Sequence, residues 1–184
     1  MFMVIEPYHR ERAVAYAKRW AYGRNPLFPN FAGIGGDCTN FISQCVYAGC
    51  CTMNFSPVLG WYYISLNDRA PAWSGVEFFF WFLTQNQGPG PFGREVGAGE
   101  LSIGDVIQLG REEGDFYHTL LVTGYANGTY LVAAHTDDSL NRRLDSYSYS
   151  RIRFLHIDGI RVVTPDTSAC FENVLSGRQI GGEL

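Results

Sequence analysis

A cysteine stands directly after a glycine-rich stretch and at the start of an expected helix. Cys38 follows Gly35, Gly36 and Asp37, and Asp is a residue type that commonly caps a helix. A thiol at this place faces the positive end of the helix dipole and the open backbone N–H groups of the first turn, which favour the thiolate. The same N–H groups can stabilise an oxyanion, so the position suits a nucleophile that attacks a carbonyl carbon. Position alone equally allows a cysteine that merely begins a buried helix.

A nucleophilic thiol in a hydrolase needs a nearby base, which is usually a histidine. The chain has four histidines. His9 lies in a charged stretch and is expected on the surface of a helix, and His156 lies beside Asp158 and is expected to be structural. His118 opens an apolar run, and His135 closes the next one. These two are the better candidates.

A strong hairpin signal brings His118 close to His135 and Asp137. Asn127-Gly128 separates two β-rich runs, and both residue types tolerate the positive φ of a two-residue turn. Counting nine residues outward from the turn places 118 opposite 137 (127 − 9 = 118; 128 + 9 = 137). His118 and the segment 135–137 should therefore share one end of adjacent strands, where one side chain can orient the imidazole as in a catalytic triad. The alternative is a pair of buried polar residues that satisfy each other.

Other patterns carry weaker signals. The run Gly33-Ile-Gly-Gly36 follows no strand and precedes no Walker lysine, which argues against a phosphate-binding loop. Asp137-Asp138 could hold a cation or act as paired carboxylates, although a solvated turn is the simpler reading. His118, His135 and Asp137 could hold zinc, but their spacing matches no diagnostic motif. The sequence therefore predicts neither a metal nor a cofactor.

The five cysteines form an odd set that fits no C-x-x-C pair and no four-ligand zinc pattern. They are Cys38, Cys45, Cys50, Cys51 and Cys170. Apart from Cys38, those in the crowded group (Cys45, Cys50 and Cys51) are expected to be small buried hydrophobes. The sequence gives little reason to expect oxidation.

Composition bounds the class of protein. The 184 residues carry 14 − 18 = −4 net charge, only 17% are charged, and 46% are hydrophobic, which excludes a disordered chain. The mild acidity makes nucleic acid a poor partner. No apolar run reaches the length that crosses a bilayer, so no membrane partner is expected. The start of the chain does not resemble a secretory signal, so the default expectation is the cytoplasm, with loss of a leader as the alternative.

The predicted elements place helices first and strands second. Helices are expected at about 8–22, from a cap at Asp37 to 49, and from Ser74 to about 86; loops are expected at 25–36, 50–72 and 88–93. Strands are expected at 105–109, 117–125, 129–135, 151–157 and 160–163, with a turn at Asp158-Gly159 between the last two. The fold class is therefore α+β with an antiparallel sheet, in one domain spanning 1–184.

Aromatic residues make up 15% of the chain. The run Phe78 to Leu83 is apolar almost all round, which indicates a deeply buried helix, with a buried strand as the competing assignment. Trp61, Tyr62, Tyr63 and Trp73 fit either the core or the wall of a groove.

Several stretches resemble a known family. They are Trp20-Ala-Tyr-Gly-Arg-Asn-Pro26, Gly35-Gly-Asp-Cys-Thr-Asn-Phe-Ile-Ser-Gln-Cys-Val-Tyr-Ala-Gly49, Gly60-Trp-Tyr62 and Leu101-Ser-Ile-Gly-Asp105. They resemble the bacterial family called Putative amidase domain, which is similar to the NlpC-type and CHAP cell-wall amidases and peptidases. The resemblance covers about residues 8–163. It implies a papain-like, circularly rearranged fold and a cysteine amidase or peptidase.

The resemblance also implies roles for individual residues. Cys38 aligns with the nucleophile, His118 with the general base, and His135 with the polar residue that orients the base. Asp37 takes a position that in some cell-wall relatives helps to recognise a substrate amine. Thr39 and Asn40 depart from the Asp-Cys-Ser-Gly-Phe block of the NlpC branch. The 17-residue separation of the two histidines (135 − 118 = 17) is longer than expected for that branch, so Asp137 stays a rival for the orienting role.

The sequence thus predicts a hydrolase that cleaves an amide bond through a Cys38 thioester, with a peptidoglycan-type peptide as one candidate substrate. Two alternatives remain open. One is a catalytically silent module of the same fold that binds a peptide or glycan through Trp61, Tyr62, Tyr63 and Trp73. The other is a transferase that passes the thioester to an amine. The sequence does not indicate the oligomeric state.

Overall fold

The computed structural model describes residues 2–34, 36–163 and 169–178. Its helices are α1 (Arg10–Trp20), α2 (Cys38–Cys50), α3 (Pro71–Ser74), α4 (Val76–Gln85), a 3-10 turn (Leu144–Ser146) and α5 (Cys170–Ser176). Its strands are β1 (Val4–Glu6), β2 (Tyr63–Ser65), β3 (Asp68–Arg69), β4 (Gly90–Val96), β5 (Val106–Gly110), β6 (Phe116–Ala126), β7 (Thr129–Ala134), β8 (Ser139–Arg143) and β9 (Arg151–Val162). The predicted α+β class is confirmed.

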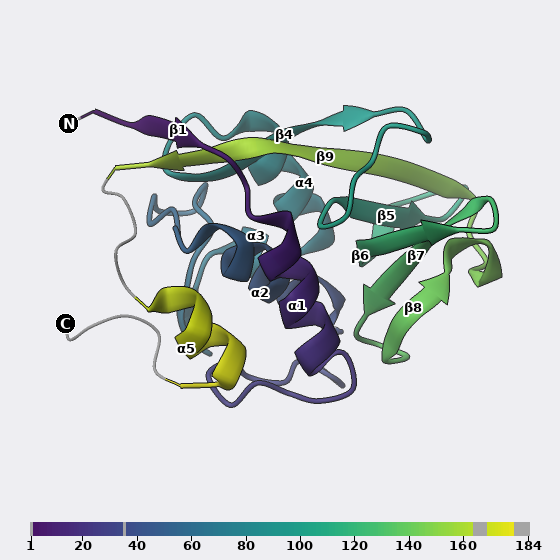
Figure 1. Ribbon diagram of the computed structural model, residues 1–184, viewed down its shortest axis with the longest axis horizontal. Coiled ribbons are helices and arrows are strands. Elements are labelled where there is room, and N and C mark those ends of the chain that lie inside the picture. Colours follow the sequence, from purple (N-terminus) through teal and green to yellow (C-terminus); the bar gives the residue numbers. More distant parts are fainter. Residues whose placement is uncertain (1, 35, 164–168, 179–184) are drawn as a thin grey trace.

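Within the described residues, seven strands form one antiparallel sheet in the order β1-β9-β5-β6-β7-β8, and β4 also pairs with β9. The strand β9 runs along the length of the molecule, while β5 to β8 gather at one end (Figure 1). The short strands β2 and β3 pair separately. The predicted turn at Asn127-Gly128 joins β6 and β7, and both residues have the positive φ that the turn requires, 50° and 80°.

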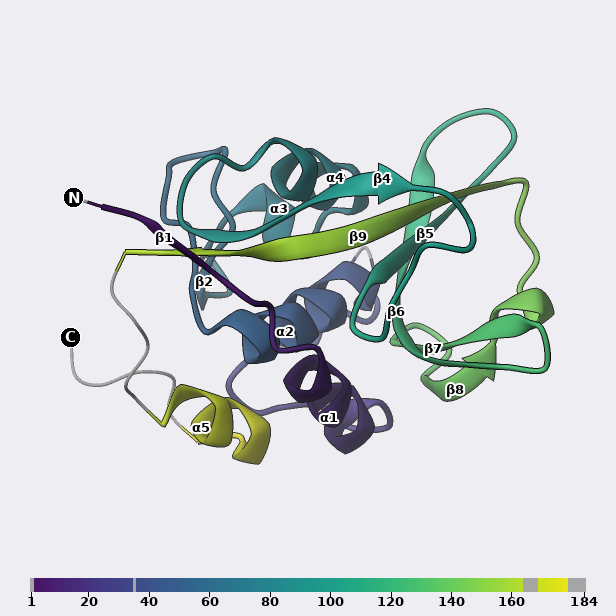
Figure 2. The same ribbon diagram turned by 45° about the horizontal axis from the view of Figure 1, so that its top comes forward.

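The helices α1 and α2 lie together on one side of the sheet, with α5 beside them (Figure 2). The larger hydrophobic cluster fills the space between these helices and the sheet, and Trp61 and Trp73 are fully buried in it. A smaller cluster packs on the other face of β5, β6 and β7. Both faces of this part of the sheet are therefore buried, one under the helices and one under the smaller cluster.

Residues 76–85 form a helix, so the competing strand assignment is wrong, and the expected burial of the aromatic run is only partly right. Phe79, Phe82 and Leu83 recur at the 3–4 spacing of one helix face and are buried. Phe78 and Trp81 point away from that face and are 57% and 52% exposed. An almost uniformly apolar helix thus leaves one aromatic side uncovered.

The expected turn at Asp158-Gly159 is wrong, because β9 continues through it. The register between β4 and β9 shifts at this point: Phe92 pairs with Gly159 and Gly93 with Ile157, so Asp158 is the extra residue of a bulge. The expected loop at 88–93 is likewise partly strand β4. A Cβ at Gly93 would overlap the backbone of His156, so glycine here permits close strand pairing.

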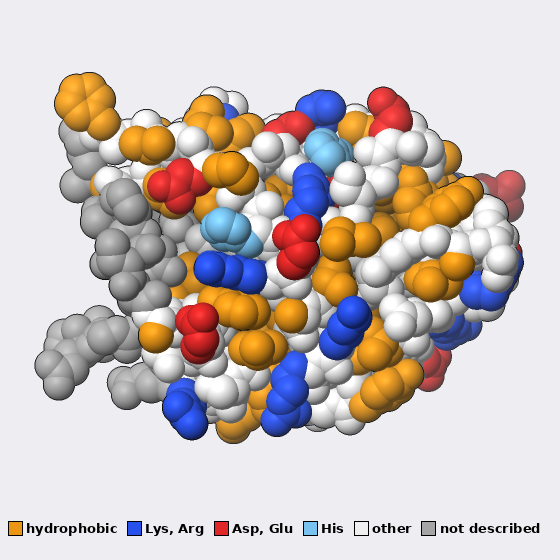
Figure 3. All heavy atoms as spheres, viewed as in Figure 1, with side chains coloured by type: hydrophobic (Ala, Val, Ile, Leu, Met, Phe, Trp, Pro, Cys, Tyr) orange, Lys and Arg blue, Asp and Glu red, His pale blue; other side chains and the backbone are white. Residues whose placement is uncertain are grey.

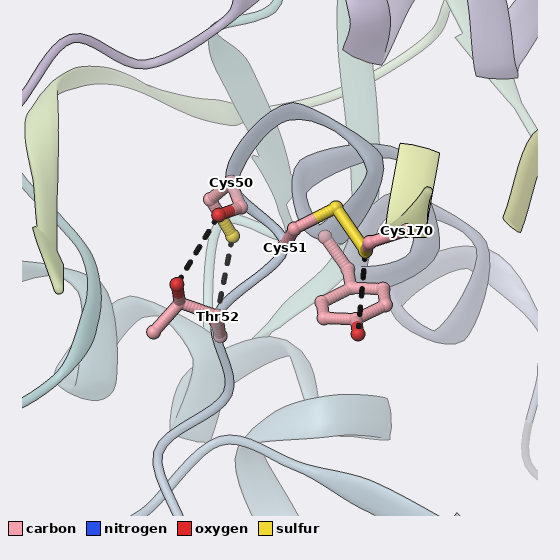
Figure 4. The surroundings of a disulfide bond; sticks show 5 residues. Cys50, Cys51, Thr52 and Cys170 are labelled. Atoms are coloured by element: carbon pink, nitrogen blue, oxygen red, sulfur yellow. Dashed lines mark hydrogen bonds between the residues drawn. A yellow bond between two sulfur atoms is a disulfide. The ribbon is translucent and has the colours of Figure 1, made fainter. Parts of the chain in front are cut away.

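A disulfide joins Cys51, just after α2, to Cys170, the first residue of α5 (Figure 4). The expectation that Cys51 is a free buried hydrophobe is therefore wrong. The sequence separation of 119 residues gave no recognisable pattern, because only the fold brings the ends of α2 and α5 together. Cys38, Cys45 and Cys50 are free and buried, as expected for Cys45 and Cys50.

Charged side chains of both signs are interspersed on the face seen in Figure 3, with no single-sign stripe. No helix in the described ranges is long and apolar enough to span a bilayer. Those same ranges contain no group of three or more His, Cys, Asp or Glu side chains suited to a metal ion.

Candidate active site

Cys38 is the first residue of α2 and lines a cavity of about 320 Å³. Its Sγ lies 4.0 Å from the carbonyl oxygen of Tyr117, the residue before His118. The cavity is lined by Gly36, Cys38, Tyr117, His118, Thr136, Asp137, Arg142 and Tyr147. The expected nucleophile and the expected base therefore share one cavity, while Gly35 falls outside the described residues.

His118 is only 8% exposed and lies beside the ring of Tyr147, with 6.0 Å between ring centroids. Burial lowers the pKa of His118 to about 4, the Asp137 carboxylate opposes this shift, and the Arg142 guanidinium reinforces it. The imidazole is therefore neutral at pH 7. A neutral imidazole can accept a proton, as a general base must.

A chain of buried polar side chains links α2 to β6. The hydroxyl groups of Thr39 and Thr119 share a hydrogen bond of 2.8 Å, and the Gln108 amide donates to Thr119 at 3.3 Å. Arg153 in turn donates to the Gln108 oxygen at 2.8 Å. Thr39 follows the nucleophile and Thr119 follows the base, so this chain sets the relative position of the two reacting groups.

His135 does not line the cavity, and a β-bulge explains why. Near the turn the register follows the counting rule, with Gly124 opposite Leu131, but after a bulge at Thr123 Val122 pairs with Val132. A one-residue shift turns every later side chain to the opposite face. Leu120 and Val122 belong to the smaller cluster, whereas Ala133 belongs to the cluster under the helices. His135 shares the face of Ala133 and stacks on Phe41 of α2, with 3.7 Å between ring centroids.

Both ring nitrogens of His135 face acceptor oxygens. Nδ1 lies 2.7 Å from the Asp37 carboxylate, and Nε2 lies 2.9 Å from the Trp20 carbonyl. Arg24 approaches the same carboxylate, with 3.0 Å from Nε to Oδ2. His135, which follows β7, thus contacts the end of α1 through the Trp20 carbonyl and the start of α2 through Asp37.

Asp37 points away from the cavity and is 1% exposed. Its Oδ1 accepts hydrogen bonds from the Asn40 amide at 2.8 Å and the Phe31 backbone N–H at 3.0 Å. Burial raises the pKa of Asp37, but the hydrogen bonds from His135, Asn40 and Phe31 outweigh it, so the pKa lies below its usual value. All of these partners belong to the protein, which leaves the expected contact with a substrate amine without geometric support.

Asp137 lies in the cavity with His118. Thr136 and Asp137 form the turn between β7 and β8 with φ values of 63° and 59°. A β-branched residue rarely adopts such a φ, and strain of this kind is concentrated at functional sites. The Asp37 backbone N–H donates to the Thr136 hydroxyl at 3.4 Å, which joins the turn to the start of α2.

Arg142 and Tyr147 are lining residues that were not found from the sequence. They follow β7 in a polar stretch without any motif, and only the return of β8 brings them to the cavity. The aromatic residues proposed for ligand recognition lie elsewhere. Trp61 and Trp73 are in the core, where their ring N–H groups donate to Ser43 and Asn40.

A second cavity of about 320 Å³ lies between the loop 54–60 and α4 and contains none of the expected site residues. Phe78 and Trp81 are among its lining residues.

The family model described as "Putative amidase domain" matches residues 7–157, a range that contains every residue that lines the cavity around Cys38. A curated protein of Bacillus subtilis (strain 168), "Uncharacterized protein YhbB", is 35% identical over 159 residues, which cover 82% of this chain and 50% of that protein. The chain thus spans about half the length of this relative. No solved structure matches it.

Proposed function

The chain belongs to the Putative amidase domain family, and we propose that it is a cysteine hydrolase that cleaves an amide bond with Cys38 as the nucleophile. The observation that carries the proposal is the cavity that Cys38 and His118 share. The neutral state of the buried imidazole supports the role of His118 as the base.

The proposed reaction has two steps. In the first, His118 takes the thiol proton as Cys38 Sγ attacks the carbonyl carbon, and the resulting oxyanion lies at the backbone N–H groups of the first turn of α2. The Asp37 side chain at the N-cap makes no hydrogen bond to these groups, which leaves them available to a substrate oxygen in this proposal. The C–N bond then breaks, His118 returns its proton to the leaving amine, and a thioester remains.

In the second step, water attacks the thioester while His118 removes a proton from it. The C–S bond breaks, the thiol regains a proton from His118, and the carboxylic acid leaves. The balance requires only the amide and water.

Asp137 is the better supported candidate for the group that orients His118. It lines the cavity with His118, and its charge raises the pKa of the imidazole against the effect of burial. His135 takes a supporting role in this proposal, because its two nitrogens are engaged by Asp37 and the Trp20 carbonyl. The catalytic role of His135 that the resemblance implied stays a prediction.

The papain-like architecture and the cell-wall substrate are also parts of the proposal. An N-terminal helix that carries the cysteine and packs on an antiparallel sheet that carries the histidine is in keeping with such a fold. A peptide of the peptidoglycan type is the substrate class suggested by the resemblance to NlpC-type and CHAP amidases.

The disulfide bears on where the protein acts. Disulfides persist in oxidising environments and are rare in the cytosol of most organisms. The Cys51–Cys170 bond therefore favours a compartment outside the cytoplasm, in place of the default expectation from the sequence.

The test is turnover of a defined amide mixture. Soluble muropeptides from muramidase-digested peptidoglycan are incubated with the wild-type chain, Cys38→Ala and, as a matched control on the same helix, Cys45→Ala. Chromatography with mass spectrometry should show newly released amines with the wild type and Cys45→Ala, and none with Cys38→Ala. Equal release by Cys38→Ala would refute the role of the thiol.

A further inference from the structure

The cavity around Cys38 contains one positive and one negative side chain that do not pair with each other. Asp137 and Arg142 both line it, yet no carboxylate in the described part of the chain lies within ion-pair distance of Arg142. The neighbouring Arg143 behaves differently, because it pairs with Asp145 at 2.7 Å. A charged group that lines a cavity without a protein counter-ion is available to a ligand.

The guanidinium of Arg142 is held in place by neutral groups. Its Nε donates to the Ser146 hydroxyl at 2.9 Å, and Nη2 lies 3.4 Å from the Ser146 carbonyl. The guanidinium also lies over the ring of Tyr147, 3.8 Å from its centroid. Neither of the two hydrogen bonds to Ser146 uses Nη1. The side chain is thus oriented before a ligand arrives, which lowers the entropic cost of binding.

Arg142 also lies close enough to the reacting groups to act on their chemistry. Burial is the main cause that lowers the pKa of His118, and Arg142 adds to the effect. A guanidinium so close to the base lies within reach of a substrate whose scissile bond is at Cys38. Since Arg binds carboxylates through paired N–H donors, a carboxylate is the group that best complements this position.

We infer that Arg142 is a specificity-determining residue that binds a carboxylate of the substrate close to the scissile amide, so that acidic amides or peptides are the preferred substrates. This inference rests on the proposed function. It adds the chemical class of the substrate, and no step of the hydrolysis requires it.

The test uses two thiol reagents of almost equal size, iodoacetate and iodoacetamide. In both, Cys38 Sγ forms a bond to the CH2 carbon, the C–I bond breaks with loss of iodide, and the thiol proton goes to the base. Only iodoacetate carries a carboxylate. The ratio of the two alkylation rates at Cys38, followed by peptide mass spectrometry, therefore measures whether the cavity attracts or repels a carboxylate next to the thiol.

The variants are Arg142→Gln and, as a matched control, Arg143→Gln. We expect Arg142→Gln to lower the ratio of iodoacetate to iodoacetamide rates about fivefold, the size of a partly exposed ion pair. Arg143→Gln should leave the ratio unchanged, because adjacent residues of a strand point to opposite faces. An unchanged ratio in Arg142→Gln, or an equal fall in both variants, would overturn the inference. The iodoacetamide rate itself reports separately on the nucleophile.

A second measurement needs no reactive thiol. The Nε–H resonance of Arg142 is assigned by its loss in Arg142→Gln, and Cys38→Ala protein is titrated with glutarate and with glutaramide. The resonance should shift with glutarate only. No shift with glutarate, or equal shifts with both compounds, contradicts carboxylate binding by Arg142.

Discussion

Replacing His118 with Gln should remove a large part of the acid sensitivity of the fold. The pKa of His118 is about 4 in the folded protein, against 6.5 for an ordinary histidine, mainly because the ring is buried. Between these values the unfolded chain binds a proton that the folded protein does not. The free energy of unfolding therefore falls as the pH falls through this window.

The size follows from the two pKa values. At about 1.36 kcal/mol per pKa unit, this one group should cost the wild type about 2.5 kcal/mol of stability between pH 7 and pH 4.5. His118→Gln carries no titrating group at this position and should escape that loss. The exposed His9 offers a matched control, and His9→Gln should keep the wild-type loss.

Urea unfolding at pH 7, 5.5 and 4.5, followed by circular dichroism, gives the three stability profiles. The difference in unfolding free energy between the two proteins should shift by about 2.5 kcal/mol in favour of His118→Gln as the pH falls from 7 to 4.5. Parallel profiles, with a difference that stays constant within about 0.5 kcal/mol, would refute a buried neutral His118. In activity, the same titration should appear as an acid limb of kcat/KM with an apparent pKa of about 4.

Three further outcomes are expected. Thr119→Val removes the hydroxyl that bonds to Thr39 and that accepts from the Gln108 amide, which keeps its bond to the Val76 carbonyl. The loss should cost about 1–3 kcal/mol of unfolding free energy and lower kcat more than it raises KM. Cys51→Ser with Cys170→Ser opens a loop of 119 residues and should cost about 2–4 kcal/mol in urea unfolding, while the wild type treated with a reductant should lose the same amount. Gly49→Ala places a methyl group against the ring of Tyr8 and should lower the melting temperature by about 4 °C or more, measured by calorimetry. A melting temperature within about 1 °C of the wild type would show that this packing is loose.

The element types of the site were readable from the sequence because they depend on local chemistry. The glycine-rich approach, the Asp37 position and the apolar stripe after Cys38 predict the start of α2 correctly. The Asn127-Gly128 turn predicts the β6–β7 hairpin and the end of the sheet at which His118 lies.

The identity of the residue beside His118 could not be read in the same way. Counting from the turn is correct as far as Gly124, but the bulge at Thr123 shifts the register by one and sends His135 to the helix face. Gly124, next to Thr123, is a residue type that often marks a bulge within a strand, but it does not say which residue is left unpaired. The place of Arg142 in the cavity and the Cys51–Cys170 disulfide could not be predicted from the sequence either, because long-range packing alone brings these residues to their partners.

The central claim is that Cys38 is a nucleophile activated by His118, and alkylation kinetics test it most directly. Iodoacetamide labelling is followed by peptide mass spectrometry in the wild type and in His118→Gln between pH 5 and 9. Cys45 and Cys50 serve as internal controls, since burial raises the pKa of both thiols. The account predicts labelling of Cys38 alone near neutral pH, at a rate that falls at least about tenfold without His118. Labelling of Cys38 at the same rate in both proteins would contradict it.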